Sequence, residues 1–538
     1  MHFPVVRNAA TRSVRTPGLW PDAAMSRHLP TAVAALASRR GGSRTGGALA
    51  LDRGQRTVFI VVGVATLVAL AAPYPLTKVL VGAALAVYWA RLLLAFDERF
   101  VGMYVLLLPT FQLAPLERLG VPALNWQTAF LGIFLVAIVH ARPPTEQGAI
   151  PRWLAYFTVV LVSSAAYSAL ALGEAPWPLL AHVKIWIFPF SLFFLGRRCT
   201  PERGQVWFLI ACVSVVSLAL SLHGLRDALT TNNLLGNRPG GLLMNQPNLF
   251  GGYLAMYAFV LLFVARTRDL SRLASLFLTA VGLLMVVVLV FTLSRGAWLA
   301  FAATTVVVGL VASRGVVLLL ALGLFFGYQW APEEATERTE MTVQAVGASS
   351  NAGLTESLDA SAAVRVVQWQ TFPQIFAAHP IFGTGLHTYE NQLFQLTGIR
   401  KAAHATPIQI GVETGAVGIV GYLGLLGTIA LTCFKRARAS GTGSLQRSLG
   451  LGLLAATICL GLLDLSGARF QEHTVTTFYF LLVGAFVGNT DRPRGGQRPP
   501  ASVKGPLGRP SSRNARSRGP AVSGPFPTRK NEPLEHLT

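Results

Sequence analysis

A few charged side chains stand where the chain is otherwise strongly apolar. Arg295 lies in FTLSRGAWLAF, between the runs LTAVGLLMVVVLV and AATTVVVGLV. A guanidinium in hydrocarbon is costly and commonly marks a functional site. Arginine binds phosphate through two parallel hydrogen bonds and keeps its charge at neutral pH. Arg295 could therefore hold a phosphate group, although an arginine that only reaches the lipid headgroups is the simpler interpretation.

Other polar residues stand near the ends of apolar runs, as Arg295 does. Two are arginines in polar segments, one is a histidine that precedes an apolar run, and one is a glutamate about two turns into that run. The remaining ones open or interrupt other runs. The set comprises Arg238, Asn248, Arg365, His404, Glu413, His182 and Lys184.

Several arginines combined with a histidine suit group transfer from a lipid pyrophosphate. The arginines would neutralise the charge of the leaving pyrophosphate. The histidine, His404, would orient or deprotonate an acceptor hydroxyl. Each residue also has a simpler interpretation: His404 as a structural cap, the RPGG segment as a turn, and Glu413 as a packing partner of an arginine. We assign no catalytic role to His379, because HPIFGTG reads as a tight turn.

Composition indicates a polytopic α-helical membrane protein. Of the 538 residues, 52% are hydrophobic and only 13% are charged. Many apolar runs are long enough for a helix to cross a bilayer core of about 30 Å, and the short alternating segments of a β-barrel are absent. The four cysteines are scattered without metal spacing. The external segments contain no compact cluster of His, Asp and Glu, so we expect neither a metal nor another cofactor.

Much of the net charge of +22 lies in two tails, residues 1–55 and 489–538. Both tails are rich in Arg, Gly, Pro and Ser, a composition typical of disordered segments. Basic segments beside membrane spans more often follow the positive-inside rule than bind nucleic acid. We therefore expect the lipid bilayer, and no nucleic acid, as a partner.

Residues 56–488 form the predicted membrane domain, with about fourteen spans, or twelve if short ones merge. The predicted spans are 57–73, 76–95, 101–116, 123–140, 152–172, 179–196, 206–223, 248–265, 273–293, 297–313, 316–330, 406–434, 448–465 and 475–488. If the N-terminus is cytoplasmic, the basic loops 197–204, 265–272 and 435–447 also fall inside, as does the C-terminus.

The large segment 331–403 then lies outside, as a periplasmic loop. Within it, SAAVRVVQWQTFPQIFAAH predicts an amphipathic helix. Phe372 and Ile375 belong to its apolar face, whereas Arg365, Gln368 and Gln374 lie opposite. We expect this helix to lie on the membrane surface with its apolar face down.

Four motifs carry a resemblance to a known family. They are NRPGGLLMNQPNLFGGYL, TLSRGAWLAF, RVVQWQTFPQIFAAHPIFGTGLHTYE and HATPIQIGVETGAVGIVGYL. In order and wording they resemble the bacterial O-antigen ligase superfamily, which includes O-antigen ligases, O-antigen and exopolysaccharide polymerases and protein O-oligosaccharyltransferases. The resemblance extends over roughly residues 56–488 and is specific in residues 235–423. It implies a fold like that of other lipid-sugar-dependent glycosyltransferases, in the bacterial inner membrane.

The resemblance also implies a reaction. The donor would be a polyprenyl-pyrophosphate-linked glycan, and the acceptor a hydroxyl of a lipid, a polysaccharide or a protein, at the periplasmic face and without a metal. Arg238 and Arg295 match arginines that engage the donor pyrophosphate, and Arg365 matches a donor-side or loop-ordering arginine. His404 matches the histidine that activates the acceptor, and Glu413 a second catalytic position. The MNQPN segment departs from the plainer PN of many relatives, which leaves the acceptor open.

The main alternative is a membrane transporter of a lipid-linked sugar or a small anion. Such a protein should carry discontinuous helices and charges near the bilayer midplane, often in two repeated halves. The sequence shows no internal symmetry, and its polar groups gather at one side of the predicted membrane domain. A non-catalytic scaffold is a second alternative. A nucleotide-sugar glycosyltransferase would need a soluble cytoplasmic domain, and the cytoplasmic loops are too short to fold one.

Overall fold

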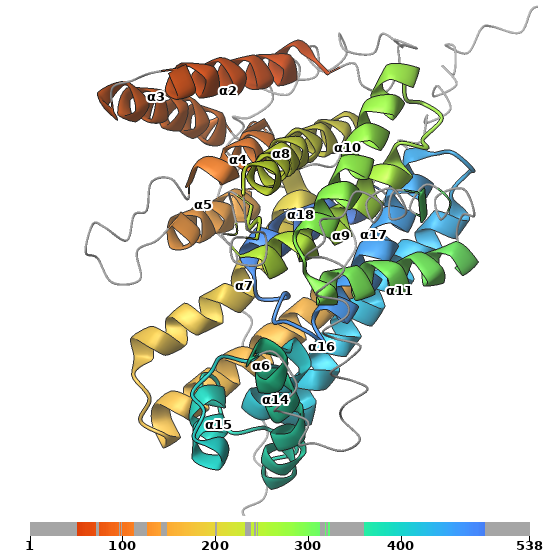
Figure 1. The fold of residues 1–538 in the computed structure, drawn as a ribbon. Coiled ribbons are helices and arrows are strands. Elements are labelled where there is room, and N and C mark those ends of the chain that lie inside the picture. The colour runs from red at the N-terminus through yellow and green to blue at the C-terminus, as the bar shows by residue number, and fades with distance from the viewer. Residues whose placement is uncertain are drawn as a thin grey trace, which may run out of the picture. The chain divides into compact units, whose positions relative to one another are not determined.

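The computed structural model describes residues 51–71, 75–95, 97, 99–111, 126–140, 148–199, 202–231, 238–241, 244, 246–311, 318, 321–322 and 360–489. These residues form fifteen α-helices and no β-strand (Figure 1). The helices are α2 (Arg53–Ala71), α3 (Pro75–Leu94), α4 (Arg99–Phe111), α5 (Trp126–His140), α6 (Ala149–Ala171), α7 (Pro176–Cys199), α8 (Arg203–Thr230), α9 (Pro247–Val264), α10 (Arg272–Phe291), α11 (Arg295–Val311), α14 (Ala360–Ala378), α15 (Tyr389–Thr397), α16 (Thr406–Ala439), α17 (Leu445–Leu463) and α18 (His473–Gly488).

The helices confirm the predicted all-α membrane architecture. Seven of them, α6 to α10, α16 and α17, are long and apolar enough to cross a membrane, and five shorter apolar helices accompany them within the described residues. Thirteen of the fourteen predicted spans coincide with a helix. The remaining one, 316–330, falls almost entirely outside the described residues, as do both basic tails and the first part of the large loop. The total of twelve to fourteen spans therefore stays a prediction.

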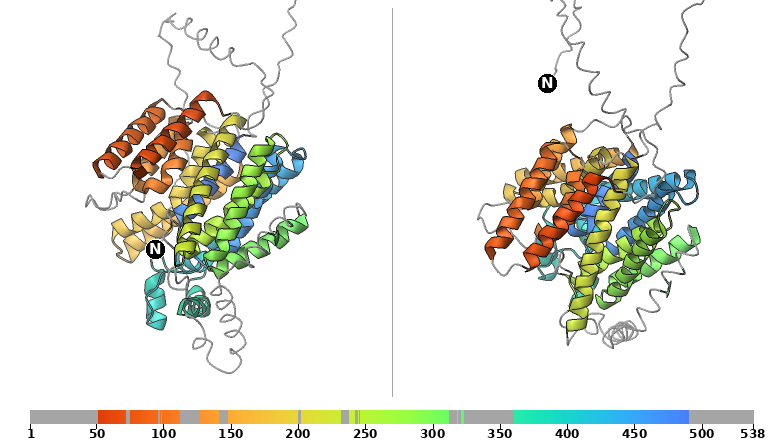
Figure 2. Two further views of the ribbon diagram at one scale, coloured as in Figure 1. Left: turned by 45° about the horizontal axis from the view of Figure 1, so that its top comes forward. Right: turned by 90° about the horizontal axis from the view of Figure 1, so that it is seen from above.

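Helix α9 lies at the centre of the helix assembly, between α10, α11 and α17 (Figures 1 and 2). All its residues from Leu249 to Val264 are buried. A helix that is apolar on every side is stable only when other helices surround it. Because α9 contacts several helices at once, it fixes where the segments that precede and follow it can place their polar residues.

Helices α7 and α18 pack so closely that their backbones are in contact. A Cβ atom placed on Gly484 would lie 2.0 Å from the carbonyl oxygen of Phe193, and one on Gly488 would lie 2.3 Å from that of Arg197. The two glycines are four residues apart, the spacing that lets membrane helices pack most closely. This contact holds α18 in place, and with it the loop that joins α17 to α18.

Helix α16 is interrupted at Gly415, where φ is 65° and ψ is −159°. The loop that precedes α15 fills the interruption. On one side of the break, Thr384 N donates to Val412 O (2.8 Å) and Gly385 N to Glu413 O (3.2 Å). On the other side, Ala416 N donates to Pro380 O (2.8 Å) and Val417 N to Ile381 O (3.2 Å). The HPIFGTG motif is therefore more than a turn, because it replaces the helical hydrogen bonds that α16 lacks.

Replacing Gly415 with alanine should destabilise the protein strongly. Its backbone conformation is one that essentially only glycine adopts, which costs a side chain about 1–3 kcal/mol. A Cβ atom there would also lie 2.3 Å from Ile381 O. The matched control is Gly427→Ala in the same helix, where a Cβ atom meets nothing within 4 Å, and where alanine should stabilise the helix by about 1 kcal/mol. Thermal unfolding of the detergent-solubilised proteins measures both; equal melting temperatures would contradict the described break.

Helix α14 is confirmed as a helix, but the prediction for its faces is wrong. Phe372 and Ile375, expected to lie on the membrane, pack with Tyr389, Leu393 and other residues of α15 and the start of α16 in a small separate core. Gln368, expected on the exposed face, is only 1% exposed. The apolar stripe predicted amphipathicity correctly, but protein rather than lipid covers it. In Figure 1, α14 and α15 accordingly lie beside α16.

Candidate functional site

The loop between α17 and α18 brings two of the predicted arginines to one residue, Ser466. Arg365 Nε donates to the Ser466 carbonyl oxygen at 3.1 Å. A Cβ atom on Gly296 would lie 2.4 Å from Ser466 Oγ, so the first turn of α11, which begins at Arg295, rests against the same residue. Arg295 and Arg365 are seventy residues apart in the sequence. The fold places the backbone of one and the side chain of the other on a shared short loop.

His404 is held beside Arg365 by the buried side chain of Gln368. The amide of Gln368 accepts from His404 N (2.9 Å) and donates to Ala402 O (2.9 Å), so both of its ends bind the segment before α16. Burial lowers the pKa of His404, and the positive charges of Arg365, Arg469 and Lys401 lower it further. The imidazole is therefore neutral at neutral pH, the state in which it can accept a proton.

Arg469 is a basic residue of this loop that the sequence analysis missed. It is 9% exposed, and burial lowers its pKa to about 10, so it stays charged at neutral pH. A Cβ atom on Gly467 would lie 2.5 Å from Arg469 Cζ, and one on Gly252 would lie 3.6 Å from Cδ. The guanidinium thus lies over its own loop and against α9. An arginine in a short loop between two predicted spans was the available signal.

Asp464 organises the loop that carries Ser466 and Arg469. Its fully buried carboxylate accepts from Thr406 Oγ1 (2.6 Å), Tyr422 OH (2.7 Å), Arg469 N (2.8 Å) and Phe470 N (2.9 Å). Burial raises its pKa to about 6, against the effect of these four donors. The bond to Thr406 ties the start of α16, and therefore His404, to the loop. Asp464 was not predicted, because nothing in the sequence links it to Thr406.

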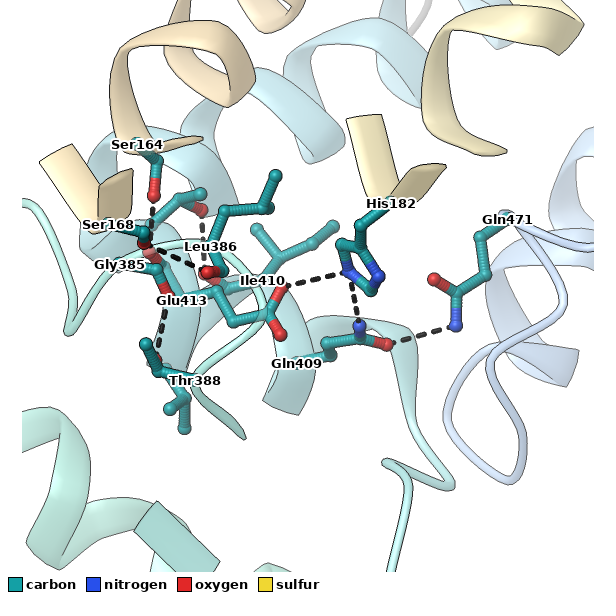
Figure 3. A network of polar contacts seen from close by, with 12 residues as sticks. Ser164, Ser168, His182, Gly385, Leu386, Thr388, Gln409, Ile410, Glu413 and Gln471 are labelled. Atoms are coloured by element: carbon teal, nitrogen blue, oxygen red, sulfur yellow. Dashed lines mark hydrogen bonds and ion pairs between the residues drawn. The ribbon is translucent and has the colours of Figure 1, made fainter. Parts of the chain in front are cut away.

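Glu413 belongs to a second polar cluster, shown in Figure 3. Its Oε2 lies 3.4 Å from Nε2 of His182, on α7. Nε2 of Gln409 lies 3.2 Å from the same ring nitrogen, and Gln471 Nε2 donates to Gln409 Oε1 at 3.0 Å. The hypothesis that Glu413 pairs with an arginine is therefore replaced by a pairing with histidine.

The two clusters are neighbours along α16 but do not merge. Glu413 lies seven residues after Thr406, about 10 Å along the helix axis, and the described contacts do not join it to His404. Gln471 connects the clusters through the chain, because it follows Arg469 by two residues. A carboxylate next to an imidazole can hold and orient a proton, so the second cluster also has the composition for acid–base chemistry.

The turn before Arg295 lies close to the start of α9. A Cβ atom on Gly251 would lie 3.1 Å from Ser294 Cβ. Asn248, half-buried, is the second residue of α9, and half-buried Arg238 stands shortly before it. Gly241, three residues after Arg238, packs against Phe250, because its Cβ would lie 2.6 Å from Cδ2 of that ring. The segments that carry Arg238, Asn248 and Arg295 therefore meet at one end of α9.

Lys184 is directed to another helix. Its Nζ donates to Thr128 Oγ1 of α5 at 3.0 Å. Its supporting role thus stays a prediction. The part of the chain that the structure describes contains no group of three or more His, Cys, Asp or Glu side chains that could hold a metal ion.

Comparison with known proteins bears directly on these residues. No curated protein matches the chain significantly. The family described as O-antigen ligase matches residues 280–423, a segment that contains Arg295, Arg365, His404 and Glu413. The family implies glycan transfer of the O-antigen ligase or polymerase type. Arg365 and His404, which contact the Ser466 loop or its neighbours, and Glu413, which pairs with His182, thus all lie in the segment 280–423 that is similar to the O-antigen ligase family.

Proposed function

We propose that the protein transfers a glycan from a polyprenyl-pyrophosphate donor to an acceptor hydroxyl. The observation that carries the proposal is that the first turn of α11, the side chain of Arg365 and the segment that carries a neutral His404 all contact the loop around Ser466. Two cationic segments suit a pyrophosphate, and a neutral imidazole suits a hydroxyl. The family match to residues 280–423 supports the same reaction class.

In the proposed reaction the acceptor oxygen attacks the anomeric carbon of the first sugar. The bond between that carbon and the pyrophosphate oxygen breaks, and the polyprenyl pyrophosphate leaves with the bonding electrons. The acceptor proton passes to His404. Arg238, Arg295 and Arg365 stabilise the negative charge that develops on the leaving group. Direct displacement inverts the anomeric centre. The energy comes from the departure of the pyrophosphate leaving group, so the proposed reaction needs no ATP, and it is proposed to proceed without a metal.

Glu413 is proposed to act with His182 on the acceptor side. Asn248 and Lys184 are proposed to support the site through the start of α9 and through α5. We place the site at the periplasmic face of a bacterial inner membrane, with both termini cytoplasmic. The basic loops 197–204, 265–272 and 435–447 support this orientation, because positively charged loops stay inside.

The transporter alternative gains one observation, the interruption of α16, since broken helices are common in transporters. Here the HPIFGTG loop closes the break with four backbone hydrogen bonds. A cavity of about 600 Å³ beside the break is lined by apolar residues and by Ser163, Ser164, Tyr167, Thr414 and His379. A path for an anion would require fixed positive charge along it, and the arginines lie elsewhere, so glycan transfer is the better supported function.

The deciding experiment uses the full-length protein in nanodiscs with a purified lipid-pyrophosphate-linked glycan. Lipid, polysaccharide and peptide acceptors are offered separately, and products are identified by mass spectrometry. We expect a glycosylated acceptor and released polyprenyl pyrophosphate in equal amounts, with and without chelator. Movement of intact donor across the bilayer of proteoliposomes, without a product on any acceptor, would instead establish the transporter.

The rate of transfer should rise with pH along an acidic limb whose midpoint lies below 6.5, the usual pKa of histidine. The reason is that burial, Arg365, Arg469 and Lys401 lower the pKa of His404, so the base form persists to lower pH. Removing one of these charges in Arg365→Gln should move the midpoint to higher pH. The measurement is transfer against pH at saturating donor; a midpoint that moves downward would contradict the assigned charge effect.

A further inference from the structure

We infer that Arg469 binds a phosphate group of the donor. Four observations support this assignment: its burial, the lack of an ion-pair or side-chain hydrogen-bond partner among the described residues, the hydrogen bonds that already bind the Asp464 carboxylate, and its position among other basic groups. The inference rests on the proposed function for the identity of the donor, but the anion site itself is testable without glycan.

Arg469 is more than nine-tenths buried, and its guanidinium has no counter-ion among the described residues. Its Nε is buried without a hydrogen-bond partner. Among the described residues, no carboxylate forms an ion pair with it within 4.0 Å, and no side-chain hydrogen bond from it is found. A buried cation without a partner is strongly destabilising, and buried polar groups in native proteins are normally satisfied.

Two acids, Asp464 and Glu472, attract Arg469, but neither forms an ion pair with it. Asp464 attracts Arg469 electrostatically, but its carboxylate already accepts from three other residues, Thr406, Tyr422 and Phe470, and from the backbone nitrogen of Arg469 rather than its guanidinium. Glu472 is half-buried, and desolvation raises its pKa despite the attraction of Arg469. Among the described residues, no ion pair within 4.0 Å joins the Glu472 carboxylate to Arg469. The Arg469 guanidinium is therefore attracted by two acids but is not neutralised by an ion pair with either of them.

The basic neighbours of Arg469 define what would satisfy it. Arg365 and Arg469 repel each other, and both act on His404. Arg365 donates to the loop at Ser466, and Arg469 belongs to the same loop, three residues after Ser466. An anion that accepts hydrogen bonds from both guanidinium groups would remove the repulsion. A diphosphate offers several oxygens for such paired contacts, and the neighbouring first turn of α11 adds the favourable end of a helix dipole.

The test compares Arg469→Met, Arg469→Lys and a control, Arg400→Met, in the full-length protein. Arg400 is an exposed arginine that lies over the Phe394 ring and binds Asn391. The probe is inorganic pyrophosphate, with sulfate at equal ionic strength for comparison. Thermal unfolding and calorimetric titration are run in detergent, and glycan transfer is assayed in parallel.

Native protein and Arg400→Met should both gain thermal stability with pyrophosphate and less with sulfate. Arg469→Met should bind pyrophosphate about 10- to 100-fold more weakly. Its melting temperature without ligand should equal or exceed that of native protein, because a methionine fills the site without an unpaired charge. Arg469→Lys should fold and bind with intermediate affinity, because lysine keeps the charge but loses the planar fork.

Two results would overturn the inference: native pyrophosphate affinity in both Arg469 variants, or a lower ligand-free melting temperature of Arg469→Met with unchanged affinity. Either would make Arg469 a structural cation. The parallel transfer assay separates this from the proposed function. Native transfer by Arg469→Met removes Arg469 from the donor site while the function stands. Pyrophosphate binding through Arg469 without any glycan transfer leaves the anion site and removes the function.

Discussion

His404→Ala should transfer glycan about 10²–10⁴-fold more slowly than the native protein, the usual contribution of a general base. Binding of the lipid-linked donor should persist, since the arginines remain. The fold should persist as well, because the hydrogen bond that ties His404 to Gln368 comes from the backbone nitrogen, which alanine keeps. Donor binding, single-turnover transfer and thermal unfolding of the purified variant measure the three quantities separately.

His379→Ala is the matched control for this prediction. His379 is exposed, and its backbone oxygen, which alanine keeps, accepts from Gly383 N. We expect its transfer rate to equal the native rate. If the His404 variant is also as fast as native protein while folded, the base is another group, and the His182–Glu413 pair becomes the first candidate.

Arg295→Lys should lose about 10²–10³ in transfer rate although the charge is conserved, comparable to the loss of one transition-state contact in a dry site. Lysine cannot form the two parallel hydrogen bonds that a guanidinium offers to phosphate. The loss should appear in the chemical step and in donor affinity, but not in acceptor affinity. Kinetics with varied donor and varied acceptor distinguish these effects.

The control for Arg295→Lys is Arg272→Lys. Arg272 is exposed and is the first residue of a helix, α10, as Arg295 is of α11. It lies at the predicted cytoplasmic end of α10, whereas Arg295 follows the opposite end of that helix. The Arg272→Lys variant should transfer at the native rate. An Arg295→Lys variant that keeps the native rate and donor affinity would show that the residue contributes charge alone, as an arginine anchored among lipid headgroups does.

The helices were predictable because a long apolar run by itself indicates a membrane-spanning helix. Thirteen spans and the helical character of α14 follow from hydropathy and period, which are properties of one segment at a time. Which neighbours those segments pack against was harder to predict from the sequence. The apolar stripe of α14 has the same pattern whether it faces lipid or protein, so Phe372 and Ile375 were assigned to the wrong environment.

The candidate site was predictable in its residue types and only partly in its pairings. Unusual charges in apolar runs identified Arg295 and Glu413, but the partner of Glu413 is a histidine over two hundred residues earlier. Arg469 and Asp464 were missed because their meaning depends on burial and on bonds to α16. Gly415 was invisible as a break, because the hydrophobic pattern of α16 continues through it and the compensating carbonyl and amide groups belong to another segment.

The break in α16 also orders events during synthesis. Ala416 lies about 15 Å along the axis from the start of α16, deep enough that unsatisfied backbone groups would cost several kcal/mol each in lipid. Pro380 to Gly385, which satisfy them, leave the ribosome before α16 does. The segment that supplies the replacement hydrogen bonds is thus synthesised before the helix break that needs them. A circularly permuted chain that delivers α16 first would enter the bilayer with the gap open, and we expect it to depend far more on membrane chaperones than the native order.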